Sequence, residues 1–289
     1  GKPTMHYAIS FFGELGAEII YPNPGFPIYE SMINYTGAKA IPYNLMEKKD
    51  NSIDAEKVLS LINEKTTLLI LCNPHNPTGS FTEKKEIDKL AKGLLNFPNV
   101  AILSDEIYSR LIFDGKEIPT LLNYPNLYDR LIVLDGWSKT YAMTGWRLGW
   151  GIWPESLIEH VFKFCVNNHS CVNAAAQYGA IAALDGPEDH LNSMRNEFII
   201  RRKLIFDGLN SLKGVNCNLP GGSFFIFPDV KNTGMNGEEF FQKCLQDAGV
   251  ATIPGTAFGK FAVHNVRLNF ATSRENISKA IEKIDKILH

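Results

Sequence analysis

The sequence reads Leu131-Ile132-Val133-Leu134-Asp135-Gly136-Trp137-Ser138-Lys139 just before its midpoint. Four apolar residues are followed by an acidic residue and then by a short loop that carries a lysine. A short run that is nearly all apolar is typical of a parallel strand that is buried on both faces. Runs of the same kind occur at Glu18–Tyr21, Thr67–Leu71, Val100–Leu103 and Arg147–Gly151. The sequence therefore predicts a mostly parallel sheet, with Lys139 just beyond one of its strands.

Helical patterns lie between these runs. Asp54–Asn63 and Glu83–Leu95 are amphipathic, and Asp54 is a suitable N-cap for the first of them. Gly1-Lys2-Pro3 also has the form of a helix start, because proline is preorganised for the first helical position. The alternation of strands and helices predicts an α/β fold of the doubly wound kind.

The pattern changes after Pro154. Helical stretches extend over 155–184 and 188–212, and short strand signals follow at Ser223–Phe227 and Val266–Phe270. A last helix carries on one face Ile277, Ile281, Ile284 and Leu288. We therefore expect two domains, a large one formed by residues 1–193 and a smaller C-terminal α+β domain formed by residues 194–289.

Composition narrows the possible partners. The chain has 289 residues, of which 45% are hydrophobic, and its formal net charge is −2. This length accommodates one large and one small domain. The nearly balanced charge favours neither nucleic acid nor an anionic membrane surface as a partner. No apolar run approaches the ~20 residues that a bilayer-spanning helix needs.

The five cysteines are scattered and odd in number. They indicate reduced thiols in a cytoplasmic protein rather than a disulfide framework. Cys165, His169 and Cys171 lie close together, but their C-x3-H-x-C spacing is not a usual zinc motif. We therefore expect no metal site, and we expect His75, in a polar loop, to be solvated.

Four polar segments carry the candidate chemistry. Asn76, Asp105 and Lys139 each follow a predicted strand, and Arg267 lies in the last strand signal. Taken singly, each segment has an ordinary explanation as a turn, a helix cap, a solvated lysine or a surface arginine. Ligands of open α/β sheets bind outside the carboxyl ends of the strands. We therefore expect the amide, the carboxylate and the lysine to converge on one crevice.

Taken together, these segments resemble those of class I/II aminotransferases of the aspartate aminotransferase type, in the fold-type-I family of pyridoxal-phosphate enzymes. The resemblance covers essentially the whole chain, because Asn-Pro-x-Asn-Pro-Thr-Gly, Asp-Glu-x-Tyr, Ser-Lys-x-x-x-Met-Thr-Gly-Trp-Arg and Arg-x-x-x-Ala occur in the family's order. It implies a three-layer large domain around a mostly parallel sheet and a smaller C-terminal α+β domain. It also implies pyridoxal 5′-phosphate as the cofactor.

The resemblance implies roles for the catalytic residues. Lys139 resembles the lysine that carries the cofactor as a Schiff base and moves the substrate proton, which an amine does near neutral pH only when its pKa is lowered. Asp105 resembles the carboxylate that keeps the pyridine nitrogen protonated. Asn76 and Tyr108 resemble the pair that hydrogen-bonds the cofactor's 3′-oxygen. One helical turn would place Tyr108 on the same face as Asp105.

The resemblance also implies a phosphate site. Arg147 matches an arginine that grips two phosphate oxygens at once, and Ser138 matches a second phosphate contact. Gly1 and Lys2 resemble the end of a glycine-containing turn whose amides hold the phosphate at a helix N-terminus. Gly136 stands where relatives often have a hydroxyl residue, so we expect one phosphate donor fewer.

Two more residues complete the implied site. Phe26 stands where the family stacks an aromatic ring on the pyridine. Arg267 matches the arginine that binds the substrate's α-carboxylate, a bidentate contact that lysine would make poorly, and Asn76 lies with it on the substrate side. The implied activity is the exchange of an amino group between an amino acid and a 2-oxo acid by a ping-pong mechanism. The amino acid itself cannot be chosen from the sequence.

Two other functions stay open on the same scaffold. One is a pyridoxal-phosphate-dependent lyase, such as a carbon–sulfur lyase or a cyclopropane-forming synthase. The other is a sensor domain that keeps the cofactor site, although the chain shows no helix-turn-helix region or basic patch. The segment Met143–Arg147 favours the aminotransferase, through family resemblance alone.

The resemblance implies a homodimer and a further N-terminal segment that covers the active site. We therefore expect the chain to begin in the middle of a fold, at the phosphate-binding turn. An open site would bind the cofactor weakly and turn over slowly, because closure strengthens charge interactions and orients the substrate.

Overall fold

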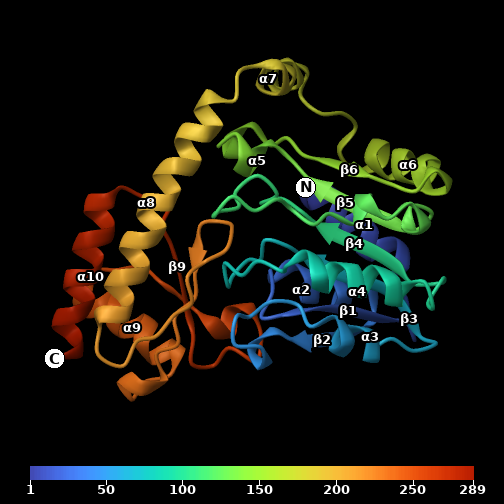
Figure 1. Ribbon diagram of the computed structural model, residues 1–289. Helices are drawn as coiled ribbons and strands as arrows, with labels where there is room; N and C mark the ends of the chain where they lie inside the picture. The colour runs from blue at the N-terminus through green and yellow to red at the C-terminus, as the bar shows by residue number, and fades with distance from the viewer.

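Two β-sheets organise the chain. The computed structural model describes all residues from Gly1 to His289. Its larger sheet has six strands in the order β2-β1-β3-β4-β5-β6, and its smaller sheet has three in the order β7-β9-β8. Figure 1 shows the large sheet with its helices on one side of the molecule, while α8, α9 and α10 gather around the small sheet on the other.

The large sheet is mostly parallel, as predicted. Its strands are β1 (Glu18–Asn23), β2 (Lys39–Asn44), β3 (Thr66–Cys72), β4 (Ala101–Asp105), β5 (Leu131–Asp135) and β6 (Trp150–Ile152). The first five pair in parallel. The prediction for β6 was wrong in direction and in start, because β6 runs antiparallel to β5 and Arg147 has a left-handed backbone with φ of 58°.

Helices cover both faces of this sheet. α1 (Lys2–Phe12) and α2 (Ile28–Thr36) cover one face, and α3 (Ala55–Ser60) and α4 (Lys84–Leu94) cover the other. α5 (Trp137–Thr140) follows β5, and α6 (Ile158–His169) and α7 (Ala174–Asp185) follow β6. Successive side chains of a strand point to opposite faces. In β3, Leu68 and Ile70 belong to the core beneath α1 and α2, whereas Leu69 and Leu71 belong to the core beneath α3 and α4. The doubly wound α/β class is therefore confirmed.

Local signals explain several element boundaries. The Asp54 side chain accepts a hydrogen bond from the Lys57 amide, so the predicted N-cap of α3 is confirmed. The helical stretch predicted over 155–184 is interrupted, because α6 ends at His169 and Ser170 adopts a φ of 59°. The Asn173 side chain then accepts a hydrogen bond from the Ala176 amide and starts α7.

The C-terminal elements build a separate core. They are α8 (Asp189–Ser211), β7 (Phe225–Ile226), α9 (Gly237–Ala248), β8 (Ile253–Pro254), β9 (Val266–Asn269) and α10 (Arg274–Leu288). Side chains from α8, α9, α10 and the small sheet form one cluster together with Tyr108, Leu111 and Phe113 from the segment after β4. Ile277 and Ile284 are buried in it, as the periodicity of the last helix predicts. The predicted domain boundary falls inside α8, and it stays a prediction.

No helix of this chain combines the length and the apolar character that a membrane crossing requires. All five cysteines are free thiols.

Arg130 ties the loop between α4 and β4 to the start of β5. Its guanidinium donates to the carbonyl oxygens of Leu94, Phe97 and Val100 at 2.9, 2.8 and 2.8 Å. Its side chain is only 10% exposed, which leaves few waters to replace these contacts. The three bonds hold together the starts of β4, which ends at Asp105, and of β5, which leads to Lys139 in α5.

We expect Arg130→Met to lower the free energy of unfolding by about 2 kcal/mol, because hydrogen bonds from a charged donor are lost while the stem keeps its packing. Urea unfolding followed by circular dichroism measures this change. Lys92→Met, on the exposed face of α4, is the matched control and should leave the free energy within about 0.5 kcal/mol of its starting value. Equal effects of the two substitutions would contradict the role given to Arg130.

Candidate active site

Three neighbouring strands of the large sheet end at the same level. The register pairs Cys72 of β3 with Asp105 of β4, and Asp105 with Leu134 of β5. The polar segments that follow these strands therefore emerge at one edge, where a cavity of about 400 Å³ lies. All ten residues predicted for the site line this cavity: Gly1, Lys2, Phe26, Asn76, Asp105, Tyr108, Ser138, Lys139, Arg147 and Arg267. Their individual roles stay predictions.

Asp105 lies at the bottom of the cavity and is 5% exposed. Its Oδ2 accepts a hydrogen bond from the Tyr29 hydroxyl at 2.6 Å, and its Oδ1 accepts one from the Ile107 amide at 3.2 Å. Burial raises the pKa of Asp105 above its usual value, and these two donors oppose the rise. A carboxylate held in this way is oriented to pair with a cationic group in the cavity.

Lys139 reaches the cavity from α5, directly after β5. Its side chain is half-buried, and burial together with the neighbouring Arg147 and Arg267 lowers the pKa of its amine. The amine lies 5.4 Å from the centre of the Phe224 ring. Desolvation and nearby cations are the conditions under which a lysine acts as a base or a nucleophile near neutral pH.

Arg267 of β9 enters the cavity from the small sheet. Its Nη1 donates to the Asn76 Oδ1 at 2.9 Å. Its guanidinium carbon lies 4.3 Å from the Phe225 ring centre and 4.6 Å from that of Phe258. Two aromatic neighbours and one amide thus restrict the guanidinium, which is suited to bidentate binding of a carboxylate.

The start of α1 forms another wall of the cavity. Gly1 is the N-cap of this 11-residue helix, and no side chain satisfies the first amides. Uncapped amides and the helix dipole favour an anion at this position. Ser138 and Arg147 face the same region, and the Arg147 Nη1 also donates to the Thr144 carbonyl at 2.7 Å.

The structure explains why residue 136 is glycine. A Cβ added to Gly136 would lie 2.7 Å from the Cα of Gly149 and 2.9 Å from the carbonyl oxygen of Leu148. The antiparallel approach of the β6 segment therefore leaves no space for a hydroxyl residue at this position.

Tyr108 and Phe26 both line the cavity. The helical turn predicted between Asp105 and Tyr108 is wrong. Hydrogen-bonded turns follow β4, with the Ser109 amide bonding to the Glu106 carbonyl, and no helix forms. These turns still bring Tyr108, which is 3% exposed, to the same cavity as Asp105.

The expectation that His75 is solvated was also wrong. His75 is 2% exposed, and burial lowers its pKa to about 3, so the ring is neutral. Its Nδ1 lies 2.8 Å from the Thr78 hydroxyl. The loop is covered because Gly221 and Gly222 donate to the Gly79 carbonyl and bring a later segment over it.

Sequence reasoning missed seven residues of the cavity, and three of them contact predicted site residues. Tyr29 holds Asp105, Thr144 lies beside Arg147, and Phe225 covers Arg267. Thr144 lies within the Met143–Arg147 motif, and Tyr29 follows the predicted Phe26 by three residues at the start of α2. Both could have been found by extending these two predictions to neighbouring residues. The sequence gives no signal for Phe225, because an apolar residue in a strand usually belongs to the hydrophobic core.

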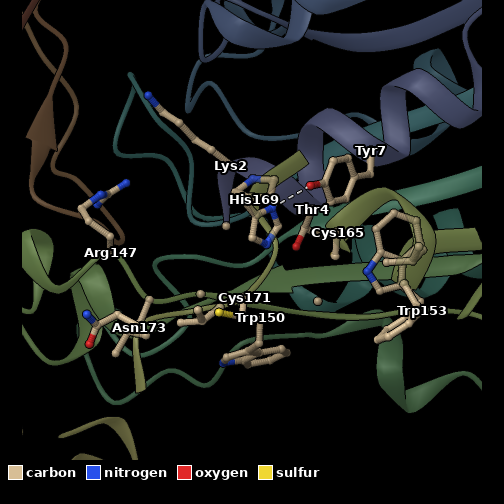
Figure 2. Close-up of a pocket in the computed structure, with 18 of the residues that line it drawn as sticks. Lys2, Thr4, Tyr7, Arg147, Trp150, Trp153, Cys165, His169, Cys171 and Asn173 are labelled. Carbon is tan, nitrogen blue, oxygen red and sulfur yellow. Dashed lines mark hydrogen bonds between the residues drawn. The ribbon is translucent and has the colours of Figure 1, made fainter. Parts of the chain in front are cut away.

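A second cavity of about 670 Å³ adjoins the first and shares Gly1, Lys2, Ser138 and Arg147 with it. Figure 2 shows the Tyr7 hydroxyl directed at the His169 ring, with Lys2 and Arg147 lying apart from this pair. The Tyr7 hydroxyl lies 2.9 Å from the His169 Nδ1 and accepts a hydrogen bond from the side-chain Nδ2 of Asn168. No group of three or more possible metal ligands occurs in the chain.

Known proteins share this arrangement over nearly the whole chain. The model of the family described as aminotransferase class I and II matches residues 4–284. This chain belongs to that family. The class I/II aminotransferase is 34% identical over 282 residues to an aspartate aminotransferase of Pyrococcus abyssi, covering 97% of this chain and 72% of the relative. It is 38% identical over 278 residues to a probable aspartate aminotransferase of Methanocaldococcus jannaschii, covering 94% and 71%.

Solved structures of aminotransferases agree with the fold. The crystal structure of an aromatic aminotransferase from Pyrococcus horikoshii OT3 superposes with a TM-score of 0.94 at 32% identity, covering 99% of this chain and 76% of that one. The aspartate aminotransferase of Rhizobium meliloti gives a TM-score of 0.94 at 29% identity, covering 99% and 74%. The family assignment, the fold class and the aminotransferase activity expected from the sequence are thus confirmed.

The Tyr29–Asp105 hydrogen bond in this aminotransferase gives a pH-dependent prediction. A carboxyl group whose folded-state pKa is raised contributes stability below its unfolded pKa of about 4, and this contribution is lost as the pH rises through the folded pKa. Tyr29→Phe removes a donor to the ionised form, so it should raise the pKa of Asp105 further. We expect a loss of about 2 kcal/mol in the free energy of unfolding at pH 7, which shrinks as the pH falls and Asp105 protonates.

Urea unfolding of the cofactor-free protein at several pH values measures this loss. Tyr43→Phe is the matched control, because the buried Tyr43 hydroxyl donates to the Ile70 carbonyl at 3.2 Å and not to a titrating group. Its effect should not vary with pH. A pH-independent loss in Tyr29→Phe would refute the coupling to Asp105.

Proposed function

We propose that this aminotransferase binds pyridoxal 5′-phosphate in the 400 Å³ cavity and exchanges an amino group between an amino acid and a 2-oxo acid in a ping-pong sequence. One observation supports this most strongly. A buried carboxylate, a lysine of lowered pKa and an uncapped helix N-terminus with an arginine lie around one cavity. The family, whose members typically use this cofactor, makes it the expected ligand.

The charges of the cavity fit an anionic cofactor and an anionic substrate. Its lining carries four cationic side chains, Lys2, Lys139, Arg147 and Arg267, against the single carboxylate of Asp105. A cavity with this excess concentrates anions. The first-turn amides of α1, Ser138 and Arg147 would hold the phosphate, and Phe26 would lie against the ring.

When bound, the cofactor supplies an electrophilic carbonyl carbon and an electron-withdrawing ring. Asp105 would keep the proton on the ring nitrogen, because its carboxylate is buried and already oriented by Tyr29. Asn76 and Tyr108 would donate hydrogen bonds to the ring oxygen.

The substrate would be held and deprotonated by two other groups. Arg267 would bind the α-carboxylate through the guanidinium edge that faces the cavity. The Lys139 Nζ would accept the proton from the substrate's α-carbon and later return one, for which its lowered pKa is suited.

We also propose the division into a large cofactor-binding domain, residues 1–193, and a small domain, residues 194–289. The separate core formed by α8, α9, α10 and the small sheet supports it. A homodimer is supported by large apolar side chains exposed on α6 and α7. Among them, Phe162, Tyr178 and Ile181 are 67%, 76% and 53% exposed, more than a monomer surface usually leaves uncovered.

The substrate test follows from the relatives' names. Several relatives are named aspartate aminotransferases and one an aromatic-amino-acid aminotransferase, so aspartate and the aromatic amino acids come first. Each is incubated singly with the cofactor-loaded enzyme, and 2-oxo acid, ammonia and pyruvate are measured. Transamination gives one equivalent of 2-oxo acid per site without ammonia, whereas release of ammonia with pyruvate would argue for a lyase.

Lys139→Ala should abolish covalent retention of the cofactor. The protein is incubated with pyridoxal phosphate, reduced with borohydride and weighed by mass spectrometry, and the labelled peptide is identified. The starting protein should gain one cofactor mass at Lys139, and Lys139→Ala should gain none. Lys2→Ala is the matched control, because it removes the other lysine of the cavity and should leave the label in place. Label in Lys139→Ala, or loss of label in Lys2→Ala alone, would show that the assignment is wrong.

Arg267→Lys should weaken every amino-acid substrate alike, since each presents an α-carboxylate. We expect an increase in KM that corresponds to about 2–4 kcal/mol, the cost of severing one partner of a desolvated charged pair. Steady-state kinetics with aspartate, glutamate and tyrosine measures it. Loss of one substrate while the others keep their KM would mean that Arg267 contacts the side chain instead.

A further inference from the structure

Two acidic residues next to Asp105 have no place in the chemistry described so far. Glu106 follows Asp105, and Asp135 ends the neighbouring strand β5. Neither lines the cavity. The Glu106 Oε1 accepts hydrogen bonds from the hydroxyls of Ser104 and Thr120 at 2.9 and 2.8 Å. Its contacts therefore lie outside the cavity.

Asp135 makes a different pair of contacts. Its Oδ2 accepts a hydrogen bond from the Ser109 hydroxyl at 2.8 Å, and its Oδ1 accepts one from the Gly136 amide at 2.6 Å. Ser109 directly follows Tyr108, in the turns after β4. Gly136 opens the segment that leads to Lys139. One carboxylate therefore bridges the two segments that carry the candidate catalytic groups.

We propose that Asp135 is a positioning residue, whose carboxylate locks the Lys139 segment to the turns that follow Asp105 and carry Tyr108. This inference rests on the proposed function, because those three residues act together only on a bound cofactor. The carboxylate strengthens the bridge, since its two oxygens accept charge-assisted hydrogen bonds from both donors. Asparagine keeps the shape but makes only neutral contacts, and its NH2 group must donate to the Ser109 hydroxyl where the carboxylate accepts from it.

The bridge has an electrostatic cost. Burial raises the pKa of Asp135 to about 6, and the charge of Asp105 on β4 adds to the rise, while Ser109 and the Gly136 amide oppose it. Glu106, whose pKa burial raises to about 7, also faces Asp135. Because the folded pKa is raised, the stability that Asp135 contributes below pH about 4 is lost as the pH rises through about 6.

Stability and positioning therefore make opposite demands on Asp135. Above pH 6 the ionised carboxylate makes both hydrogen bonds and carries the cost of a buried charge. Substitution of a residue with a merely structural role would lower the free energy of unfolding at every pH. A positioning residue can be replaced by its neutral analogue without that loss, while cofactor binding suffers.

The experiment compares Asp135→Asn, Ser109→Ala and their double variant with the unaltered chain. The dissociation constant for pyridoxal phosphate is measured by fluorescence quenching, and the unfolding midpoint of the cofactor-free protein is measured at pH 8. We expect each single variant to raise the dissociation constant about tenfold, as for one lost or weakened charge-assisted hydrogen bond, and the double variant to raise it by less than the product of the two single effects, because both act on one bridge. The unfolding midpoint of Asp135→Asn should be no lower than that of the unaltered chain.

Ser104→Ala is the matched control, because it also removes a serine hydroxyl from a buried carboxylate but does not touch the Lys139 segment. Its dissociation constant should stay within about twofold, well under the effect of one hydrogen bond. An unchanged constant in Asp135→Asn and Ser109→Ala overturns the proposal. Equal losses of affinity and midpoint in all the variants, the control included, overturn it as well.

A chain that binds no cofactor at all would refute the proposed function, and the bridge is then tested separately. In the cofactor-free protein, hydrogen exchange at the Gly136 amide should be faster in Ser109→Ala than in Ser104→Ala, because Asp135 loses its second anchor. Equal exchange rates in these two variants would overturn the bridge itself.

Discussion

Hydrogen-bonded pairing of β3, β4 and β5 in one parallel register is the constraint on which the rest of the structure depends. It sets Cys72, Asp105 and Leu134 at one level, so the segments that follow all emerge at the same edge. Apolar side chains packed on both faces keep this register, because a slip of one residue would exchange the two faces of a strand. Helix packing on each side of the sheet thereby fixes the distance between the carboxylate and the lysine.

The site gathers groups that are costly to bury. Asp105 is buried and Lys139 is half-buried, and in each case burial favours the uncharged form. The surrounding structure compensates with directed contacts. Tyr29 donates a hydrogen bond to Asp105, and Asn76 and two aromatic rings contact the guanidinium of Arg267. The first amides of α1 have no side-chain cap and face the same site. The same pattern extends one layer outward to Asp135.

Sequence alone predicted the parts of this arrangement that have local signals. Strands β1, β3, β4 and β5 are nearly all apolar and were found, whereas the edge strand β2, largely half-exposed, was missed. The ten predicted site residues meet in one cavity. The motifs of Asn76, Asp105 and Lys139 stand at the ends of β3, β4 and β5, which are neighbours in the sheet. Contacts between distant segments left no signal, which is why Tyr29 was missed as a partner of Asp105, and why His75 was wrongly expected in solvent although a later segment covers its loop.

The confinement of Arg267 has a stereochemical consequence. Rings on Phe225 and Phe258 and the amide of Asn76 leave the guanidinium little freedom to rotate. A carboxylate that binds it adopts one plane, and Lys139 approaches from a fixed direction. Under the proposed function, only one mirror-image form of an amino acid can then direct its α-hydrogen at the lysine while its side chain stays clear of the cavity wall. Chirality of the product would thus be decided by two phenylalanines that take no part in the reaction.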